Sequence, residues 1–248
     1  MEARRPDSET IPSVSVWPAL ISAPAGRRAQ AKELAVLALL YLLQTVNAEM
    51  LRRAAGSLDR QLTGTASGRI VADWALIQAD HIHPVAMLVC GVWLAALALA
   101  LGRGRRPPRW TFDGLGVWFS LRLLAEYLTI NGLIFEGSKV EPGVLLGQIV
   151  LYLPYFVITW GWIFHRLDLV NQDQPGRIVM LSDADQARGI SAFDYYHASI
   201  STLLNKGKPT IAGVSRTGRL LVLLYLAMVL GLYALTFARI LQLTRSLI

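Results

Sequence analysis

Long apolar segments constrain the fold of this chain more than any other feature of its sequence. Residues 220–238 carry no charge, and residues 144–164 form a second uncharged stretch. Residues 85–101 and the shorter 34–48 follow the same pattern. A helix of about 20 apolar residues crosses the ~30 Å hydrocarbon layer of a membrane. The sequence therefore predicts an all-α membrane protein, built as a helical bundle in the lipid bilayer.

The composition supports this class and excludes others. Of the 248 residues, 54% are hydrophobic and 17% are charged, whereas soluble domains average roughly 45–50% and about 25%. A single cysteine excludes a disulfide scaffold and any multi-cysteine metal site. The formal net charge of +7 is explained by basic residues that flank the apolar segments, so no nucleic-acid partner is expected.

The basic residues also predict which side of the membrane each end occupies. Residues 1–30 form a flexible tail with four scattered prolines and no secretory signal, so the first span should remain as an anchor. Positive charges collect on the cytoplasmic side of membrane proteins. We therefore expect a cytoplasmic N-terminus and, within 31–110, a membrane hairpin followed by a cytoplasmic loop; the basic residues concerned are Arg27, Arg28, Lys32, Arg103, Arg105, Arg106 and Arg109.

A fifth segment, 112–135, is largely apolar but contains Asp113, Arg122 and Glu126. Arg122 and Glu126 are four residues apart, so they can pair on one face of a helix. Residues 111–142 therefore contain either a membrane helix with that pair turned inward or an amphipathic helix along the interface.

The segment between the last two spans contains a short helix. Residues 167–190 are polar and predict a surface loop, whereas residues 191–204 begin with Ser191 as a candidate N-cap and Asp194 in the first turn. This helix is too short and too polar to cross a membrane. It is either a re-entrant helix, which protein or a water-filled cavity must surround, or an ordinary surface helix.

Residues 147–243 resemble the pore domain of tetrameric potassium-channel-like proteins. Six positions align with that family's filter and the loop after it, namely Thr202, Leu203, Gly207, Val214, Gly218 and Arg219. The resemblance implies an ion-channel-like domain over 143–248, with an outer helix at 144–166, a pore helix at 191–204 and an inner helix at 219–243 with a hinge at Gly231. It also implies a filter-like loop, a homotetramer and a location in a bacterial inner membrane.

The filter itself departs from the family. Where the family has T-V-G-Y-G, this chain has Asn205, Lys206, Gly207, Lys208 and Pro209. A potassium filter replaces the ion's water with rings of backbone carbonyls, and its glycines adopt positive φ. Proline fixes φ near −65°, so the usual carbonyl ladder cannot form at Pro209. Potassium selectivity is therefore not expected.

The charge of this region disfavours cations and suggests anions. In a tetramer Lys206 and Lys208 would bring eight ammonium groups near one axis, and two unit charges about 8 Å apart repel by about 2 kcal/mol at an effective dielectric of 20. Residues 195–248 contain no Asp or Glu. Rings of Lys or Arg occur in anion pores, so conduction or binding of small inorganic anions is one hypothesis. The alternative is a non-conducting membrane scaffold or subunit that keeps the pore fold for assembly or partner binding.

The resemblance also bears on residues 112–135. Potassium-channel-like proteins place the pore loop outside, which requires an even number of crossings before residue 144 and favours the interfacial helix. A crossing helix would invert the pore, as in glutamate-receptor-like channels.

No enzyme is expected, and neither a cofactor nor a metal. The sequence lacks a Gly-rich phosphate loop, a nucleophile elbow and paired catalytic carboxylates. His81 and His83 diverge on a helix and are expected as polar residues at the membrane surface. We expect interfacial anchoring for His165 and a buried side chain for His197.

Overall fold

The structure, a computed structural model, describes residues 26–59, 66–135, 142–171, 177–182, 191–204, 207 and 209–246. The tail before residue 26 and the filter residues Asn205, Lys206 and Lys208 lie outside the described residues. The elements are α2 (Arg27–Asp59), α3 (Ala66–Ile77), the π-helix η1 (Gln78–Ile82), α4 (His83–Gly102), α5 (Arg109–Phe135), α6 (Pro142–Asn171), β1 (Val179–Ser182), α7 (Ala192–Leu203), β2 (Thr210–Gly213) and α8 (Arg216–Ser246).

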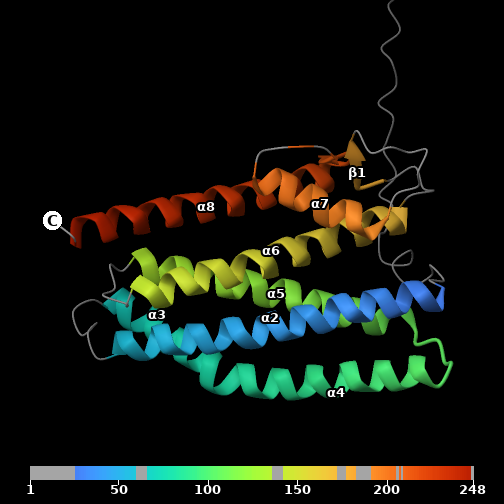
Figure 1. The fold of residues 1–248 in the computed structure, drawn as a ribbon, viewed down its shortest axis with the longest axis horizontal. Helices are drawn as coiled ribbons and strands as arrows, with labels where there is room; N and C mark the ends of the chain where they lie inside the picture. The colour runs from blue at the N-terminus through green and yellow to red at the C-terminus, as the bar shows by residue number, and fades with distance from the viewer. Residues whose placement is uncertain are drawn as a thin grey trace, which may run out of the picture.

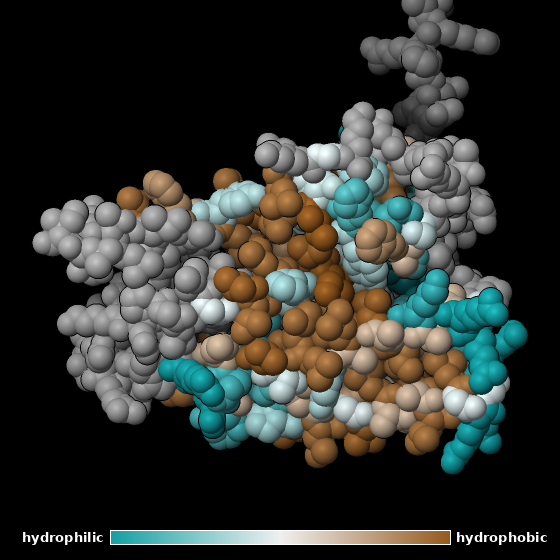
Figure 2. Space-filling model, in the orientation of Figure 1, coloured by the Kyte–Doolittle hydropathy of each residue, from teal (hydrophilic) through white to brown (hydrophobic). Residues whose placement is uncertain are grey.

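Long helices run along one common direction and form the body of the molecule (Figure 1). Among the described residues, three helical stretches are long and apolar enough to cross a membrane, namely Arg27–Arg53, Arg69–Gly102 and Arg216–Ala234. Figure 2 shows apolar side chains across the middle of the visible face and polar ones near the start of α2. The predictions of a mainly helical fold and of membrane-spanning helices are confirmed.

Helix α5 lies inside the bundle, where it packs between α2 and α6 (Figure 1). Its buried side chains include Phe112, Phe119 and Leu123, which belong to the common core. A helix at the membrane interface would lie across the ends of the spans, whereas α5 runs along them. This packing agrees with the other alternative for 112–135, a helix within the bundle with the Arg122–Glu126 pair turned inward. Crossing of a membrane by α5 stays a prediction.

A π-turn joins α3 to α4 and is explained by Pro84. Proline has no N–H, and its ring collides with the carbonyl four residues earlier, which here belongs to Asp80. The chain accommodates this by widening the helix over Gln78–Ile82, and the His83 N–H donates to the Gln78 carbonyl five residues back. The sequence analysis did not predict the helix before residue 83.

The segment between α6 and α8 contains α7 and a two-stranded sheet. Ser191 caps α7 in a reciprocal capping box with Asp194, as the sequence predicted. Strand β2 pairs antiparallel with β1, with Val179 opposite Gly213 and Ser182 opposite Thr210. The segment 167–190, predicted as a surface loop, therefore also contains a strand.

Helix α8 starts directly after this sheet. Ser215 caps it by accepting a hydrogen bond from the Gly218 N–H at 3.0 Å. A Cβ atom on Gly218 would overlap the carbonyl oxygen of Ile178, so glycine permits the close approach of β1 and α8. The boundaries of α6, α7 and α8 agree to within a few residues with those predicted for the outer, pore and inner helices.

Candidate functional site

The described part of the predicted filter lies between the C-terminus of α7 and the start of β2. Gly207 has φ +93°, a left-handed conformation that favours glycine. Thr202 donates its hydroxyl hydrogen to the Ala198 carbonyl at 2.8 Å, within α7. Pro209 stands immediately before β2. The structure therefore places Thr202, Gly207 and Pro209 in one short segment, while the predictions for Asn205, Lys206 and Lys208 are not tested.

A hollow of about 220 Å³ lies beside Gly207. Helices α7 and α8, together with β2, form its walls, and both hydroxyl groups and apolar side chains line it: Ser201, Thr202, Gly207, Thr210, Ile211, Val222 and Leu226. Hydroxyl groups at membrane depth are tolerated where they face protein or water rather than lipid.

Gly231, the predicted hinge, lies within the continuous helix α8. A Cβ atom at this position would overlap the hydroxyl of Tyr127 on α5, so the missing side chain makes room for that phenol. The structure thus supplies a packing reason for this glycine, and hinge motion stays a prediction.

Charged side chains join several helices at the end of the bundle where α2 begins. Arg109 of α5 forms a two-pronged ion pair with Glu33 of α2. Arg166 of α6 donates to both oxygens of Asp113, at 2.7 and 2.9 Å. Trp162 donates from its indole N–H to Glu33 at 3.1 Å. We call Glu33, Arg109, Asp113 and Arg166 the charged end.

Asp168 extends these contacts toward α7. Arg177 donates to its two carboxylate oxygens at 2.6 and 2.8 Å, and the Tyr195 hydroxyl also donates to it. The hydrogen bond to Asp168 raises the pKa of the Arg177 guanidinium. Burial, and then the bond to Asp168, raise the pKa of the Tyr195 phenol above its usual range. Asp168 therefore ties α7 and the chain before β1 to the end of α6.

A second polar group lies in the interior of the bundle. Arg122 donates to the Gln78 side-chain carbonyl at 2.9 Å, and its other terminal nitrogen lies 3.5 Å from a Glu126 oxygen. Gln78 in turn donates to the Thr129 hydroxyl at 3.0 Å. All four side chains are buried. The Arg122–Glu126 pair predicted from spacing is confirmed; we call Gln78, Arg122, Glu126 and Thr129 the polar centre.

The polar centre lies deep in the bundle. At 1.5 Å per residue, Arg122 and Glu126 are about 20 and 25 Å along α5 from Arg109 at the charged end. A hydrocarbon layer of ~30 Å would therefore contain both. Ionisable side chains at such depth are rare and usually mark a functional position.

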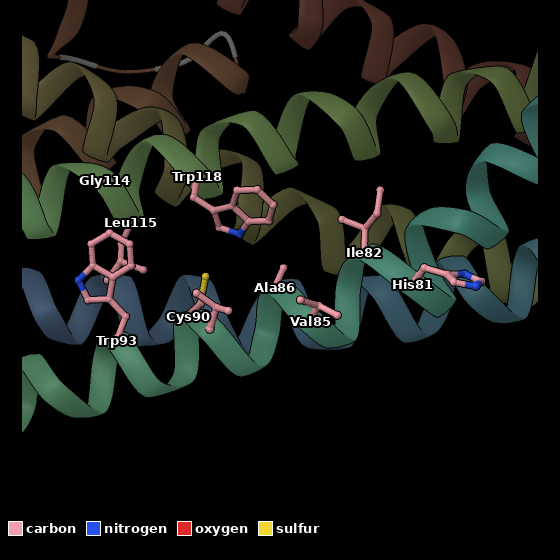
Figure 3. Close-up of a pocket in the computed structure, with 10 residues that line it drawn as sticks. His81, Ile82, Val85, Ala86, Cys90, Trp93, Gly114, Leu115 and Trp118 are labelled. Carbon is pink, nitrogen blue, oxygen red and sulfur yellow. The ribbon is translucent and has the colours of Figure 1, made fainter.

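An apolar groove of about 560 Å³ separates η1 and α4 from α5. Figure 3 shows Trp93 and Trp118 on either side of Cys90, with His81 at the far end.

The histidines differ in exposure. His81 is exposed and His83 is half-buried, so the two side chains diverge as predicted. His165 packs edge-on against Tyr195. The prediction of a buried His197 is wrong, because the side chain is exposed in the single chain.

Sequence reasoning missed Gln78 and the partners of the charged end. Gln78 is a polar residue in a long apolar segment, and that signal could have identified it. Glu33 and Arg109 are 76 residues apart in sequence, so no local spacing connects them.

None of the protein-family models, curated proteins or solved structures that we compared with the chain matches it significantly.

Proposed function

We propose that this chain forms an ion-channel-like membrane assembly in which residues 191–213 are a re-entrant segment. The observation that carries the proposal is the path of the chain between α6 and α8. Helix α7 begins beside the end of α6, to which Tyr195 is tied through Asp168. After α7 the chain returns to form β2, which pairs with β1 from the segment that follows α6. A segment that enters and leaves at the same end of a bundle is what a pore loop requires.

The chemistry of this segment favours anions over potassium. Gly207 keeps the positive φ that a filter glycine needs, but Pro209 occupies the position of the second glycine. The lysines at 206 and 208, with no carboxylate after residue 194, make the loop cationic. We propose that four copies surround an axis, as the resemblance implies, and that small inorganic anions are bound or conducted there.

The packing of α5 changes the orientation that we propose. With a cytoplasmic N-terminus and α5 as a crossing helix, α6 ends on the cytoplasmic side. The entrance of α7 then also faces the cytoplasm, together with the basic loop at 103–109. This orientation follows the positive-inside rule, because Arg177, Arg216 and Arg219 belong to the same end.

Current recording from the reconstituted protein tests conduction. We expect an anion current that falls in Lys206→Ala and in Lys208→Ala and is abolished in the double variant. Lys32→Ala is the matched control, since Lys32 is exposed on α2 and lies outside the loop. A potassium current that both substitutions leave unchanged would contradict the proposed filter. No current in any symmetric salt would favour the non-conducting scaffold, for which the degenerate filter sequence is the supporting observation.

A labelling experiment tests the orientation. The one native cysteine, Cys90, is buried, so a cysteine introduced as Ser191→Cys at the exposed start of α7 reports its own accessibility. We expect a membrane-impermeant maleimide to label it only after the cells are opened. Arg69→Cys, at an exposed position near the opposite end, should be labelled in intact cells. The reverse pattern would contradict a cytoplasmic entrance.

A further inference from the structure

Glu126 differs from the other ion-paired carboxylates of the described helices. Asp113 receives two guanidinium N–H groups from Arg166 within 2.9 Å, and Asp168 receives two from Arg177 within 2.8 Å. In Glu126, only Oε1 contacts a guanidinium nitrogen, that of Arg122, at 3.5 Å. Its Oε2 is buried and has no hydrogen-bond partner in the described part of the chain. The carboxylate deepest in the bundle is therefore the least coordinated of the three.

The neighbouring groups do not complete this coordination. Arg122 directs its best hydrogen bond, at 2.9 Å, to Gln78 instead. Tyr152 and Tyr155 of α6 lie within electrostatic reach of Glu126, but their hydroxyls donate to backbone carbonyls of α5. The Gln78 amide donates to Thr129. These hydroxyl and amide donors are committed to other acceptors, whereas Arg122 Nε is buried without a partner in the described structure.

Such an arrangement is costly for a permanently ionised group. A buried carboxylate needs hydrogen bonds to compensate for its lost water, and without them the ionised form is strongly disfavoured. A proton on the free oxygen removes this penalty, because it converts the anion into a neutral carboxyl. Arg122 would then keep its hydrogen bond to Gln78, so the polar centre stays connected in both forms.

We propose that Glu126 is a proton-binding site in the middle of the membrane bundle. The proton binds to Oε2 and forms a neutral carboxyl, and the net charge of the Arg122–Glu126 pair changes from zero to +1. The ligand is a proton taken from water, and no bond other than O–H forms or breaks. This site belongs to α5 and η1 and is independent of the filter loop.

The charged and titratable groups around the site come from several helices. Arg122 is the cation on the same helix, and His83 of α4 is within electrostatic reach of Arg122, with its Nδ1 lacking a partner in the described structure. Helix α6 supplies Tyr152 and Tyr155. From α2, Gln44 lies at similar depth, about 17 Å along its helix from Glu33, and its buried amide has no partner among the described residues. None of these groups is a second carboxylate, so a carboxyl band from this site belongs to Glu126.

Infrared difference spectroscopy of the full chain in lipid tests the proposal, because the C=O band of a protonated carboxyl is separate from that of a carboxylate. We expect a carboxyl band that grows as the pH is lowered and that is absent from Glu126→Gln. Its frequency should be that of a carboxyl with few hydrogen bonds. Glu49→Gln is the control, since Glu49 is an exposed carboxylate on α2, and this variant should keep the band.

Two results would overturn the proposal. Identical spectra for wild type and Glu126→Gln at every pH would mean that the carboxylate stays ionised. A Glu126 band of constant size would mean that it stays protonated. Glu126→Asp provides a second measurement should the Gln variant fail to fold, because it retains a carboxyl and should shift the band rather than remove it.

Discussion

The charged end and the polar centre hold their ionic groups in different ways. At the charged end Asp113 contacts Arg166 at two points and Arg109 at 3.4 Å, so its carboxylate is fully occupied. In the polar centre Glu126 has one long contact and a free oxygen. The first arrangement fixes one structure, whereas the second leaves room for a change of charge. Burial alone therefore does not show whether an ion pair is structural; the number of donors at the carboxylate does.

The largest effect is expected for Asp113→Ala. This substitution leaves the buried guanidinium of Arg166 without its bidentate partner and also removes a contact of Arg109. Breaking a buried ion pair by removing one partner costs about 3–5 kcal/mol. Denaturant unfolding in detergent micelles should show this loss of stability. A loss below about 1 kcal/mol would mean that the charged end does not hold the helices together.

A smaller effect is expected for Arg122→Gln. If Glu126 can take up a proton, the loss of its cation does not leave an uncompensated charge. The cost should then be about 1–2 kcal/mol, mainly from the hydrogen bond to Gln78. The same unfolding assay, run at two pH values, should give the smaller cost at the lower pH. A cost as large as that of Asp113→Ala at both would mean that the two ion pairs are alike.

Thr129→Val should cost about 1 kcal/mol, because it removes the acceptor of the buried Gln78 amide and leaves that donor unpaired. Thr45→Val is the matched control. Thr45 is exposed on α2, and its hydroxyl donates at 2.9 Å to the Tyr41 carbonyl of its own helix and lies 4.0 Å from Met87 Sδ of α4. Sulfur is a weak acceptor, so no measurable loss is expected there. Equal effects in the two variants would show that the bond between η1 and α5 contributes nothing.

No measurable change in stability is expected for Glu49→Gln. Its ion pairs with Arg52 and Arg53 are exposed, and water screens such pairs. Thermal unfolding next to Asp113→Ala would test the contrast directly. A clear destabilisation would mean that exposed pairs matter as much as the charged end.

Features that depend on local spacing could be predicted from the sequence. The long apolar segments, the Ser191 cap and the Arg122–Glu126 pair all follow from residues at most a few positions apart. The helices α6 and α8 were located for the same reason, and the α8 stretch Arg216–Ala234 is also a candidate membrane span.

Features that depend on which helices meet could not be predicted. Glu33 and Arg109 pair across 76 residues, and strands β1 and β2 are four-residue segments whose pairing joins separate parts of the chain. The interfacial position was preferred for 112–135 because the pore resemblance requires an even number of crossings before residue 144, and that parity carries no information on which helices α5 packs against. In the structure Asp113 pairs with Arg166 of α6, and Arg122 pairs with Glu126 and donates to Gln78 of η1, so the segment can lie within the bundle. In the candidate filter, the glycine that adopts positive φ was located from the sequence. The residues that contact α7 could not be predicted, because they come from distant parts of the chain.

The π-turn at Gln78–Ile82 sets the relation between α3 and α4. One additional residue in a helical turn rotates everything that follows by about 100° relative to an uninterrupted α-helix. Side chains before and after the turn are therefore out of phase: α3 packs against both α2 and α5, whereas α4 packs mainly against α2. Deleting a single residue there would bring the apolar faces of α3 and α4 back into alignment. Either Gln78 would then lose its contacts to α5, or α4 would lose its packing against α2.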